Sequence, residues 1–472
     1  MHIMMMTIQR RFALLATAAV VGLTLAGCAS TAISASARAP SLVEAPPIVF
    51  VHGNGDTAAL WQTTVWRFES NGWPRDHLHA INVPYPLSRD DDAKPQSGRS
   101  STAENMAYLQ AEVNKVLKAT GASKVVLVGN SRGGNAIRNY IYNGGGATTV
   151  SHAILGGTPN HGVWAIAGFR EGNEFSGTGP FLTALNAPKN AAGDEVSGPV
   201  KWMTIRSDNN DKFAQPDGVW IGQKGTPTGV TFAGPELKGA VNMVIARIDH
   251  RETSFSPAAF EATYRFITGK APTTTTIAPE TRVVLNGTIT GMGVDSTDPK
   301  TGNFGNNLPL AGAQLQVFAT DTATGVRTGA ALLNKTVGAD GQWGPLTAPP
   351  GVPLEFEITA PGYATTHIYR SGFVRSSQII HLRPERIAEA DKASNSIVTM
   401  TRPRGYFDLA RDKVLLDGAV PTDVPAGAGA STAKVKPTGS KRTIAGEFNG
   451  ERVVGQTWPA ASGHVVLLEL TY

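Results

Sequence analysis

The sequence is poor in the features that mark several protein classes. Its 472 residues contain a single cysteine, Cys28, so the folded chain can form no internal disulfide. It has no dense run of lysine and arginine, and a formal charge of +5 over this length indicates no nucleic-acid partner. Charged residues make up only 17%, which together with 41% hydrophobic residues excludes wholesale disorder. The 52 glycines and 30 prolines favour many turns and strands over a helical bundle.

The N-terminus carries an export signal. Arg10 and Arg11 precede the apolar run "FALLATAAVVGLTLAG", which is too short for a membrane span and is typical of a signal peptide. The run ends in "LAGC", which resembles the lipobox of bacterial lipoproteins. That resemblance implies a signal peptide over residues 1–28 and lipidation of Cys28; a plain secretory signal is the alternative. We expect an exported protein, either secreted or anchored by its lipid in a membrane at the cell surface or periplasm, with residues 29–45 as a tether.

From Pro46 to about Lys270, short apolar runs alternate with segments that have apolar residues at helical spacing. The runs "PPIVFVHG", "KVVLVG", "VSHAILGGTP" and "VKWMTIRS" read as strands buried on both faces. Helices are expected in "TAENMAYLQAEVNKVLKATG", "NAIRNYIYNGGG" and "SPAAFEATYRFITGK". This alternation predicts an α/β domain over residues 46–270, with a mostly parallel sheet covered by helices on both faces.

The composition changes after residue 270. Residues 271–280, "APTTTTIAPE", are expected to be a Thr/Pro linker, and beyond them the helical pattern nearly disappears. Short alternating segments separated by turns, such as "TRVVLNGTIT", "AGAQLQVFAT" and "HVVLLELTY", are typical of β-sandwich modules. The segment "ERIAEADKASNS" predicts a division into a β-sandwich module, residues 281–388, and a second β-rich module, residues 389–472.

A glycine-rich turn separates the strand "KVVLVG" from the helix that follows it. Residues 129–133, "GNSRG", match the Gly-x-Ser-x-Gly pattern of a nucleophile elbow. The serine of such a turn takes a strained conformation that raises its hydroxyl above the sheet, and bulky residues two positions away would clash. Gly129 and Gly133 fit there, and the helix N-terminus favours negative charge at the site. We therefore expect Ser131 to be a nucleophile rather than a small residue in an ordinary connection.

A serine nucleophile of this kind needs an oxyanion hole. The loop "HGNGDTAALW" follows the first strand, so we expect it to supply one donor, at Asn54. The second donor is expected to be the backbone N–H of Arg132, the residue after the nucleophile. The Arg132 side chain need not take part. His52 is expected to order the loop, because it precedes the serine in the chain.

The acid and the histidine should follow the serine in the order Ser, Asp or Glu, His. His250 lies in the polar loop "ARIDHRETSF", just before the last helix, where a base that reaches Ser131 is expected. His161, at a strand end in "GGTPNHG", is the alternative. His152 lies inside an apolar strand and is expected to pack there.

The acid is expected in the loop "DNNDKFAQPDG" after the strand "KWMTIRS". An orienting carboxylate belongs in a turn a few residues beyond the strand, and Asp211 fits best. Asp208 is the alternative acid, although it can instead cap the turn; Asp217 is a third candidate. Asp249 cannot easily reach the ring of its neighbour His250 and is expected to be structural.

Together these motifs resemble the α/β-hydrolase superfamily, and within it the small bacterial lipases and triacylglycerol-lipase-like esterases. The resemblance rests on "FVHGNGDTAALW", "VVLVGNSRGGNAIRNYI", "ILGGTPNHG", "TIRSDNNDKFAQPDG" and "DHRETSFSPAAFEATYRFI". It implies a triad of Ser131, Asp211 and His250, with Asn54 and Arg132 at the oxyanion positions. A hydrolase followed by a β-rich tail is similar, more loosely, to lipases whose C-terminal β domain helps to bind lipid. Arg132 departs from the apolar residue that such lipases often carry.

The expected function is an exported serine hydrolase that cleaves carboxylic esters through an acyl-enzyme, with no cofactor and no metal. Its substrate is an ester, with lipid and polymer both open. A polyester depolymerase is a related alternative; an amidase, an acyltransferase or an inactive surface-binding lipoprotein are the others. Residues 162–190 are expected to be a mobile lid or an apolar acyl-site wall, or else ordinary packing. The aspartate-bearing loops are expected to be solvated turns rather than metal sites; they hold Asp90, Asp91 and Asp92, and Asp295 and Asp298.

Overall fold

The computed structural model describes residues 45–294 and 303–472. The predicted signal peptide, Cys28, almost all of the tether and the loop with Asp295 and Asp298 lie outside these residues. Within the part of the chain that is described, no helix combines the length and the apolar character needed to cross a bilayer.

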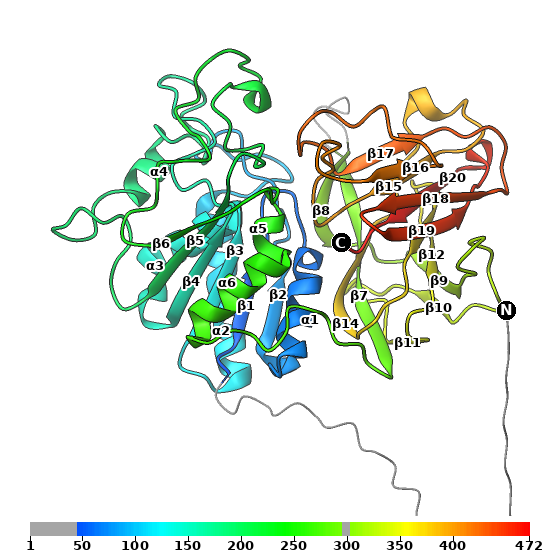
Figure 1. Cartoon of the computed structure of the whole chain (residues 1–472), viewed down its shortest axis with the longest axis horizontal. Coiled ribbons are helices and arrows are strands. Elements are labelled where there is room, and N and C mark those ends of the chain that lie inside the picture. The colour runs from blue at the N-terminus through cyan, green and yellow to red at the C-terminus, as the bar shows by residue number, and fades with distance from the viewer. Residues whose placement is uncertain (1–44, 295–302) are drawn as a thin grey trace, which may run out of the picture. The chain divides into compact units, whose positions relative to one another are not determined.

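A six-stranded sheet organises residues 45–270 (Figure 1). Its strand order is β2-β1-β3-β4-β5-β6, and every neighbouring pair is parallel. The strands are β1 (Ile48–Val51), β2 (Leu78–Ile81), β3 (Val125–Asn130), β4 (Val150–Gly156), β5 (Lys201–Ser207) and β6 (Val241–Ile245).

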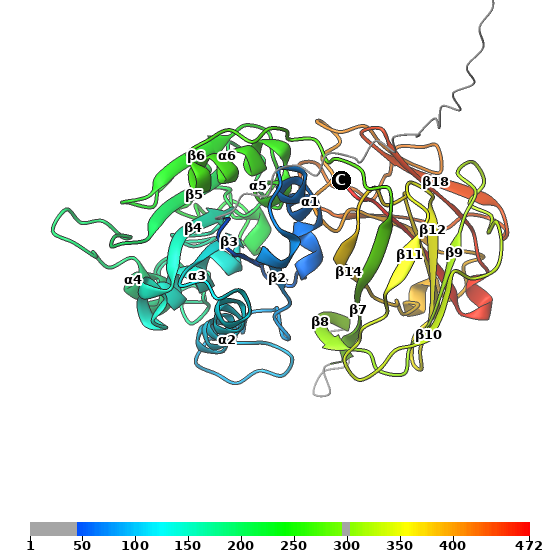
Figure 2. The same ribbon diagram turned by 90° about the horizontal axis from the view of Figure 1, so that it is seen from below.

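Helices cover both faces of this sheet. Val49 and Val51 of β1 pack in one hydrophobic cluster with α2 and α3, whereas Ile48 and Phe50 pack in another with α1 and α6. Figure 2 shows α2 and α3 on the opposite side of the sheet from α1 and α6. The predicted α/β fold is therefore confirmed. The helices are α1 (Gln62–Ser70), α2 (Thr102–Thr120), α3 (Arg132–Asn143), α4 (Pro180–Leu185), α5 (Glu252–Phe255) and α6 (Pro257–Thr268). The 3-10 turns of the described chain are η1 (Ala58–Trp61), η2 (Arg75–His77), η3 (Gly146–Thr148), η4 (Val219–Ile221), η5 (Glu389–Asp391) and η6 (Ala460–Ser462).

Side chains at the helix ends explain where α2 begins and stops. The Ser101 hydroxyl accepts a hydrogen bond from the Glu104 N–H, and the Glu104 carboxylate accepts one from the Ser101 N–H. This reciprocal capping box satisfies two backbone donors that the first turn leaves without a partner. Gly121, with φ of 69°, closes the helix in the left-handed conformation that glycine adopts without strain.

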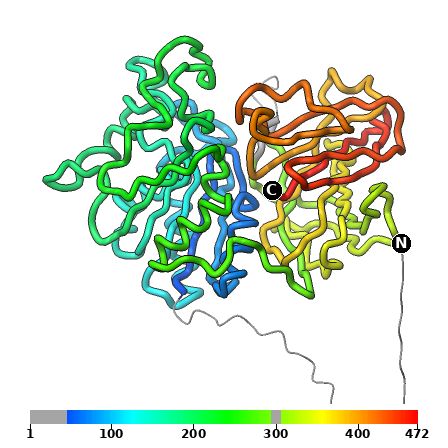
Figure 3. The backbone as a smooth tube through the Cα atoms, viewed as in Figure 1, coloured from blue at the N-terminus to red at the C-terminus, as the bar shows by residue number. Residues whose placement is uncertain are grey.

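The described residues after 280 form three β-sheets. The largest has the order β10-β9-β12-β13-β20-β15-β17, the second has β11-β7-β14 with β8 paired to β7, and the third has β16-β18-β19. Figure 3 follows the backbone from the α/β region into these strands, whose colour runs from green to red. The strands are β7 (Val283–Val294), β8 (Asn303–Pro309), β9 (Gln314–Ala319), β10 (Leu333–Thr336), β11 (Leu346–Ala348), β12 (Leu354–Thr359), β13 (Thr365–Arg370), β14 (Ser377–Leu382), β15 (Val398–Thr401), β16 (Val414–Leu416), β17 (Thr432–Val435), β18 (Thr443–Phe448), β19 (Glu451–Gln456) and β20 (His464–Glu469).

The seven-stranded sheet contains strands from both halves of the tail. Strand β20 lies between β13 and β15 and is parallel to both. Strand β13 precedes residue 389, whereas β15 and β20 follow it. The division predicted near residue 390 therefore separates strands that share one sheet, and the second module donates the adjacent strands β20, β15 and β17 to that sheet.

Helix α1 packs against the tail as well as against its own sheet. The Trp66 Nε1–H donates to the carbonyl oxygen of Ser376 at 2.8 Å, and the Trp66 ring packs edge-on against Phe373 with ring centroids 6.4 Å apart. The Arg67 guanidinium donates to the carbonyl oxygens of Thr275 and Phe255 at 2.9 and 2.7 Å. The tail is thus joined to the α/β region by the buried Trp66–Ser376 hydrogen bond and not only through the linker.

Candidate active site

Ser131 lies on the sharp turn between β3 and α3. Its backbone angles, φ 53° and ψ −122°, fall in a region that residues with a side chain rarely adopt. A Cβ on Gly133 would lie 2.4 Å from the carbonyl oxygen of Val51, and one on Gly129 would lie 2.8 Å from the carbonyl carbon of Gly133. Both positions therefore require glycine, which is the steric reason for the Gly-x-Ser-x-Gly pattern.

A buried imidazole–carboxylate pair lies at the same site. Asp211 Oδ2 is 2.8 Å from His250 Nδ1, and Asp211 Oδ1 accepts a hydrogen bond from the Phe213 N–H at 2.8 Å. The exposed fractions are 9% for Ser131, 5% for Asp211 and 4% for His250, so these contacts are largely withdrawn from water. The carboxylate fixes the orientation of the ring, which leaves Nε2 as the ring nitrogen that can act as a base.

Asn130 connects the serine turn to the histidine loop. Its Nδ2 amide lies 3.2 Å from the carbonyl oxygen of His250, 3.2 Å from that of Gly156 and 3.3 Å from the Thr253 hydroxyl oxygen. The Thr253 hydroxyl also donates to the His250 carbonyl oxygen at 2.7 Å. The backbone that carries the imidazole is therefore tied to the residue immediately before Ser131. No local sequence pattern predicts this contact, because the two residues are 120 positions apart.

Ser131 and His250 line one cavity of about 210 Å³. Its walls are largely apolar, and part of residues 162–190 supplies them, together with the loop after β5. The apolar lining residues are Val163, Trp164, Phe175, Phe213, Trp220 and Ile221. The polar lining includes Asn54, Asp56, Asn130, Arg170, Arg251 and Tyr406.

The loop after β1 approaches the serine closely. A Cβ on Gly53 would lie 2.9 Å from the Ser131 Cβ, so the backbone of this loop reaches the nucleophile position. The Asn54 side chain accepts a hydrogen bond from the Ser88 N–H at 2.8 Å, which holds the loop in place. The backbone N–H of Arg132 is the first of α3 and so has no carbonyl partner within the helix. His52 is buried, its Nε2 accepts from the Val83 N–H at 3.0 Å, and burial lowers its pKa.

The Arg132 side chain is bonded to the segment of residues 162–190, part of which lines the cavity. Its guanidinium makes two bonds to Glu174, from Nε to Oε1 at 2.7 Å and from Nη2 to Oε2 at 2.8 Å, and a third to the Ser100 carbonyl oxygen at 2.7 Å. Burial raises the pKa of Glu174, and the positive charge of Arg132 opposes that shift. Because both side chains are buried, this bidentate pair anchors residues 162–190 to the elbow.

The alternative residues have other partners. His161 Nε2 lies 2.8 Å from Glu195 Oε1, and the His152 ring packs edge-on against Phe266. Asp208 Oδ1 accepts from the N–H groups of Asn209 and Arg247, and Asp217 Oδ1 accepts from the Val219 N–H. Among the described residues that line the cavity, none of these four side chains occurs.

One group of side chains in the described chain could hold a metal ion. Glu355, Glu357 and His367 bring ligand atoms within 4.8 Å of one another. Arg327 donates to the carboxylates of Glu355 and Glu357, and its positive charge already compensates part of their negative charge. In the loop that holds Asp90, Asp91 and Asp92, the Asp91 carboxylate forms an ion pair with Lys94.

Three of the cavity residues that were not predicted, Arg251, Asp56 and Tyr406, lie together, and Arg251 contacts the other two. Arg251 pairs with Asp56, with Nε 3.0 Å from Oδ2, and its guanidinium carbon lies 4.9 Å from the centroid of the Tyr406 ring. Burial raises the pKa of Tyr406 to about 12. Arg251 could have been predicted to lie at the site because it follows His250 in the chain. Tyr406 could not, because its partner Asp249 is 157 positions away and no local pattern links the two.

Lys212 packs against Tyr406 but is not itself among the residues that line the cavity, and no carboxylate of the described residues is bonded to its amine. Its Nζ is 2.9 Å from the Gly429 carbonyl oxygen and 4.0 Å from the centroid of the Tyr406 ring. Burial, aided by the positive charge of Arg251, lowers its pKa to about 8. The folded state thus favours the neutral amine more than the unfolded state does.

Lys212→Met is expected to change how stability depends on pH. Below pH 8 the wild type bears the full cost of burying the cation, and above the ordinary lysine pKa of 10.5 it bears none. From pH 7.5 to 10, the free energy of unfolding of the wild type should rise relative to Lys212→Met by about 1–3 kcal/mol, after allowance for partial exposure. Urea unfolding of both proteins at the two pH values measures this. A difference that does not change with pH would refute the assignment.

Two protein families match this chain. The family described as Lipase (class 2) matches residues 45–178, and the family described as Lipase C-terminal domain matches residues 281–387. The first match contains the elbow and the loop after β1. The second contains all of the strands from β7 to β14.

Solved lipases are similar to parts of the chain. The propeptide form of a Bacillus licheniformis lipase is 20% identical, with 59% of this chain and 58% of that chain covered and a TM-score of 0.35. Its mature form is 21% identical, with 48% and 96% covered and a TM-score of 0.34. Aspergillus fumigatus lipase B is 16% identical, with 49% and 54% covered and a TM-score of 0.33. The chain thus spans little more than half the length of two of these proteins.

The parallel sheet and the serine elbow are in keeping with these matches. The chain is therefore similar to the class 2 lipases over residues 45–178 and to the lipase C-terminal domain over residues 281–387.

Proposed function

We propose that this protein is an exported serine hydrolase that cleaves carboxylic esters through an acyl-enzyme formed on Ser131. The observation that carries the proposal is the convergence of Ser131 and the buried His250–Asp211 pair on one apolar-walled cavity. The chain order of serine, aspartate and histidine is the order of α/β-hydrolase triads. Export and lipid anchoring through Cys28 rest on the N-terminal sequence alone and belong to the same proposal.

The proposed reaction has two steps. His250 Nε2 takes the proton of the Ser131 hydroxyl as the oxygen attacks the ester carbonyl carbon, and the oxyanion is held by the N–H groups of Arg132 and Asn54. The imidazolium, stabilised by Asp211, protonates the departing alcohol. Water then attacks the acyl-serine with His250 as base, and the acid leaves with the serine restored.

The cavity walls favour an apolar acyl group. Trp164, Phe175 and Ile221 offer no charge to pair with a polar acyl chain, and apolar contact area is what such a wall contributes to binding. This supports esters with an aliphatic or aromatic acid part, whether the alcohol belongs to a glyceride or to a polyester.

A substrate panel tests the proposal. The wild type is assayed on nitrophenyl esters of rising acyl length, on emulsified triglyceride, on aliphatic polyester film and on the matching nitrophenyl amides. Hydrolysis of the esters, with labelling by a fluorophosphonate that peptide mapping locates at Ser131, is the expected result. Hydrolysis confined to amides, or phosphonate labelling at another serine, would overturn it. Clearance of polyester film without hydrolysis of triglyceride would identify the protein as a polyester depolymerase.

A further inference from the structure

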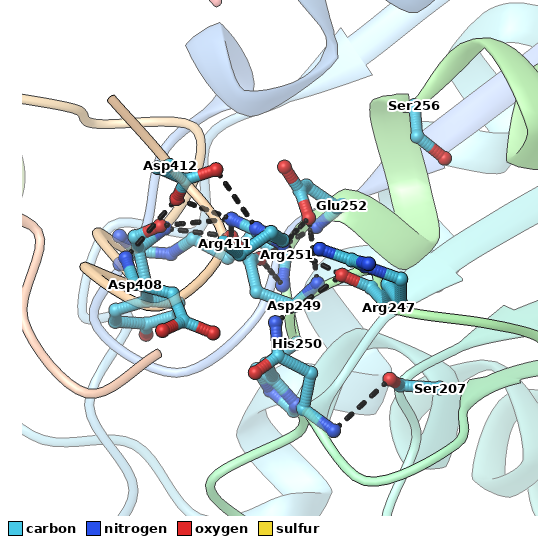
Figure 4. Close-up of polar contacts among 12 residues, drawn as sticks. Ser207, Arg247, Asp249, His250, Arg251, Glu252, Ser256, Asp408, Arg411 and Asp412 are labelled. Atoms are coloured by element: carbon cyan, nitrogen blue, oxygen red, sulfur yellow. Dashed lines mark hydrogen bonds and ion pairs between the residues drawn. The ribbon is translucent and has the colours of Figure 1, made fainter. Parts of the chain in front are cut away.

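The histidine loop is built around two carboxylates. Asp249 Oδ1 accepts hydrogen bonds from the N–H groups of Arg251 and Glu252, at 2.8 and 2.9 Å, and Glu252 Oε2 accepts one from the Asp249 N–H at 2.6 Å. His250 lies within this turn (Figure 4). The conformation of the backbone that carries the imidazole therefore depends on the positions of the Asp249 and Glu252 carboxylates.

The tail supplies the partners of these carboxylates. Arg402 Nη1 lies 2.7 Å from Asp249 Oδ2, and Arg402 Nη2 lies 2.5 Å from Glu252 Oε1. Arg411 Nη1 lies 2.6 Å from Glu252 Oε2, and the Tyr406 N–H donates to Asp249 Oδ2 at 2.7 Å. Figure 4 shows Arg411 among Glu252, Asp408 and Asp412. The segment 402–411 thus bonds the residues on both sides of His250.

Because these ion pairs are buried, the loss of either partner is costly. The Asp249 side chain is fully buried and that of Arg402 is 3% exposed. Burial and the neighbouring Asp249 charge raise the pKa of Glu252, and both arginines oppose that rise. Removing one partner of a buried pair leaves the other charge without compensation, so the turn is expected to move until water reaches it. Such a movement displaces His250 relative to Asp211 and Ser131.

We propose that Arg402, assisted by Arg411, is a positioning residue for His250, so that the C-terminal region completes the catalytic site. The same segment places the Tyr406 ring in the cavity wall, which couples the shape of the cavity to the arginine contacts. This inference rests on the proposed function, because it concerns the base of that reaction. It assigns the tail a part in catalysis that is separate from any binding of lipid.

The test measures turnover for each active serine. Full-length wild type, Arg402→Met and Arg402→Lys are titrated to completion with a fluorophosphonate and assayed on nitrophenyl butyrate. For Arg402→Met we expect kcat per titrated serine to fall about 10- to 100-fold, with KM within about twofold, because small displacements of a catalytic group cost rate rather than binding. Arg402→Lys keeps the charge but replaces the guanidinium fork with a single ammonium nitrogen, so it should recover part of this loss. The rate of phosphonate labelling should fall with kcat.

Arg442→Met is the matched control. Arg442 makes a bidentate pair with Asp417, at 2.9 and 2.6 Å, on the exposed part of the tail, and its loss should leave kcat unchanged. Wild-type kcat per serine in Arg402→Met would overturn the proposal. If that variant does not fold, wild-type kcat in Arg402→Lys would overturn it. A wild type that hydrolyses no ester and takes no label would instead refute the proposed function.

Discussion

Ser131→Ala is expected to lower kcat on nitrophenyl esters by about 10⁴-fold or more while the protein folds as before. The hydroxyl is the proposed nucleophile, and the methyl group that replaces it occupies the same Cβ position, so the neighbouring glycine contacts are unchanged. Steady-state assays, with a control for contaminating esterase, measure the fall in kcat. The thermal unfolding transition shows whether the variant folds as the wild type does. Activity within tenfold of the wild type would assign the nucleophile to another residue.

Ser131→Gly separates loss of the nucleophile from backbone strain. Glycine adopts the φ of 53° found at this position without the steric cost that serine bears. We expect it to be as inactive as Ser131→Ala but more stable by about 1–2 kcal/mol, because the strain relieved exceeds the added flexibility of the unfolded chain. Equal melting temperatures for the two variants would show that the turn stores no strain.

The sequence predicts the inner strands of the sheet and the elbow because their physical signals are local. Strand β3 is buried throughout, so its apolar run stands out, and the glycines at 129 and 133 are required by contacts within a few residues of Ser131. The edge strands β2 and β6 were missed because they are largely half-exposed or exposed, and their sequences, "LHAI" and "VNMVI", lack bounded apolar runs of comparable strength.

Long-range contacts account for the other omissions. Helix α1 buries Gln62, Thr63, Thr64 and Arg67, because α5 and the linker pack against residues that a solvent-facing helix would expose. Its apolar periodicity is therefore weak. Tyr406 and Arg402 reach the histidine loop from the far end of the chain, and only the fold brings such positions together.

Asp211→Asn is expected to lower kcat by about 10⁴-fold with little change in KM, through the proton on the imidazole rather than through geometry. Asp211 Oδ1 already accepts the Phe213 N–H, so the amide oxygen of the variant should keep that place and its Nδ2 should face His250 Nδ1. An amide N–H donates, so Nδ1 must become an acceptor and the ring proton moves to Nε2. That nitrogen can then no longer take the Ser131 proton.

Asp208→Asn is the matched control for this substitution. Asp208 accepts its backbone hydrogen bonds through Oδ1, from Asn209 and Arg247, and an amide oxygen can accept both. We expect kcat within about threefold of the wild type, because the change removes a charge near the strand end without altering the acceptor at the turn. Kinetics of both variants on nitrophenyl butyrate decide between the two carboxylates. Full activity in Asp211→Asn with a large loss in Asp208→Asn would transfer the orienting role to Asp208. Comparable losses in both variants would mean that His250 acts as a base because of the total negative charge in this loop, and not because of one oriented carboxylate.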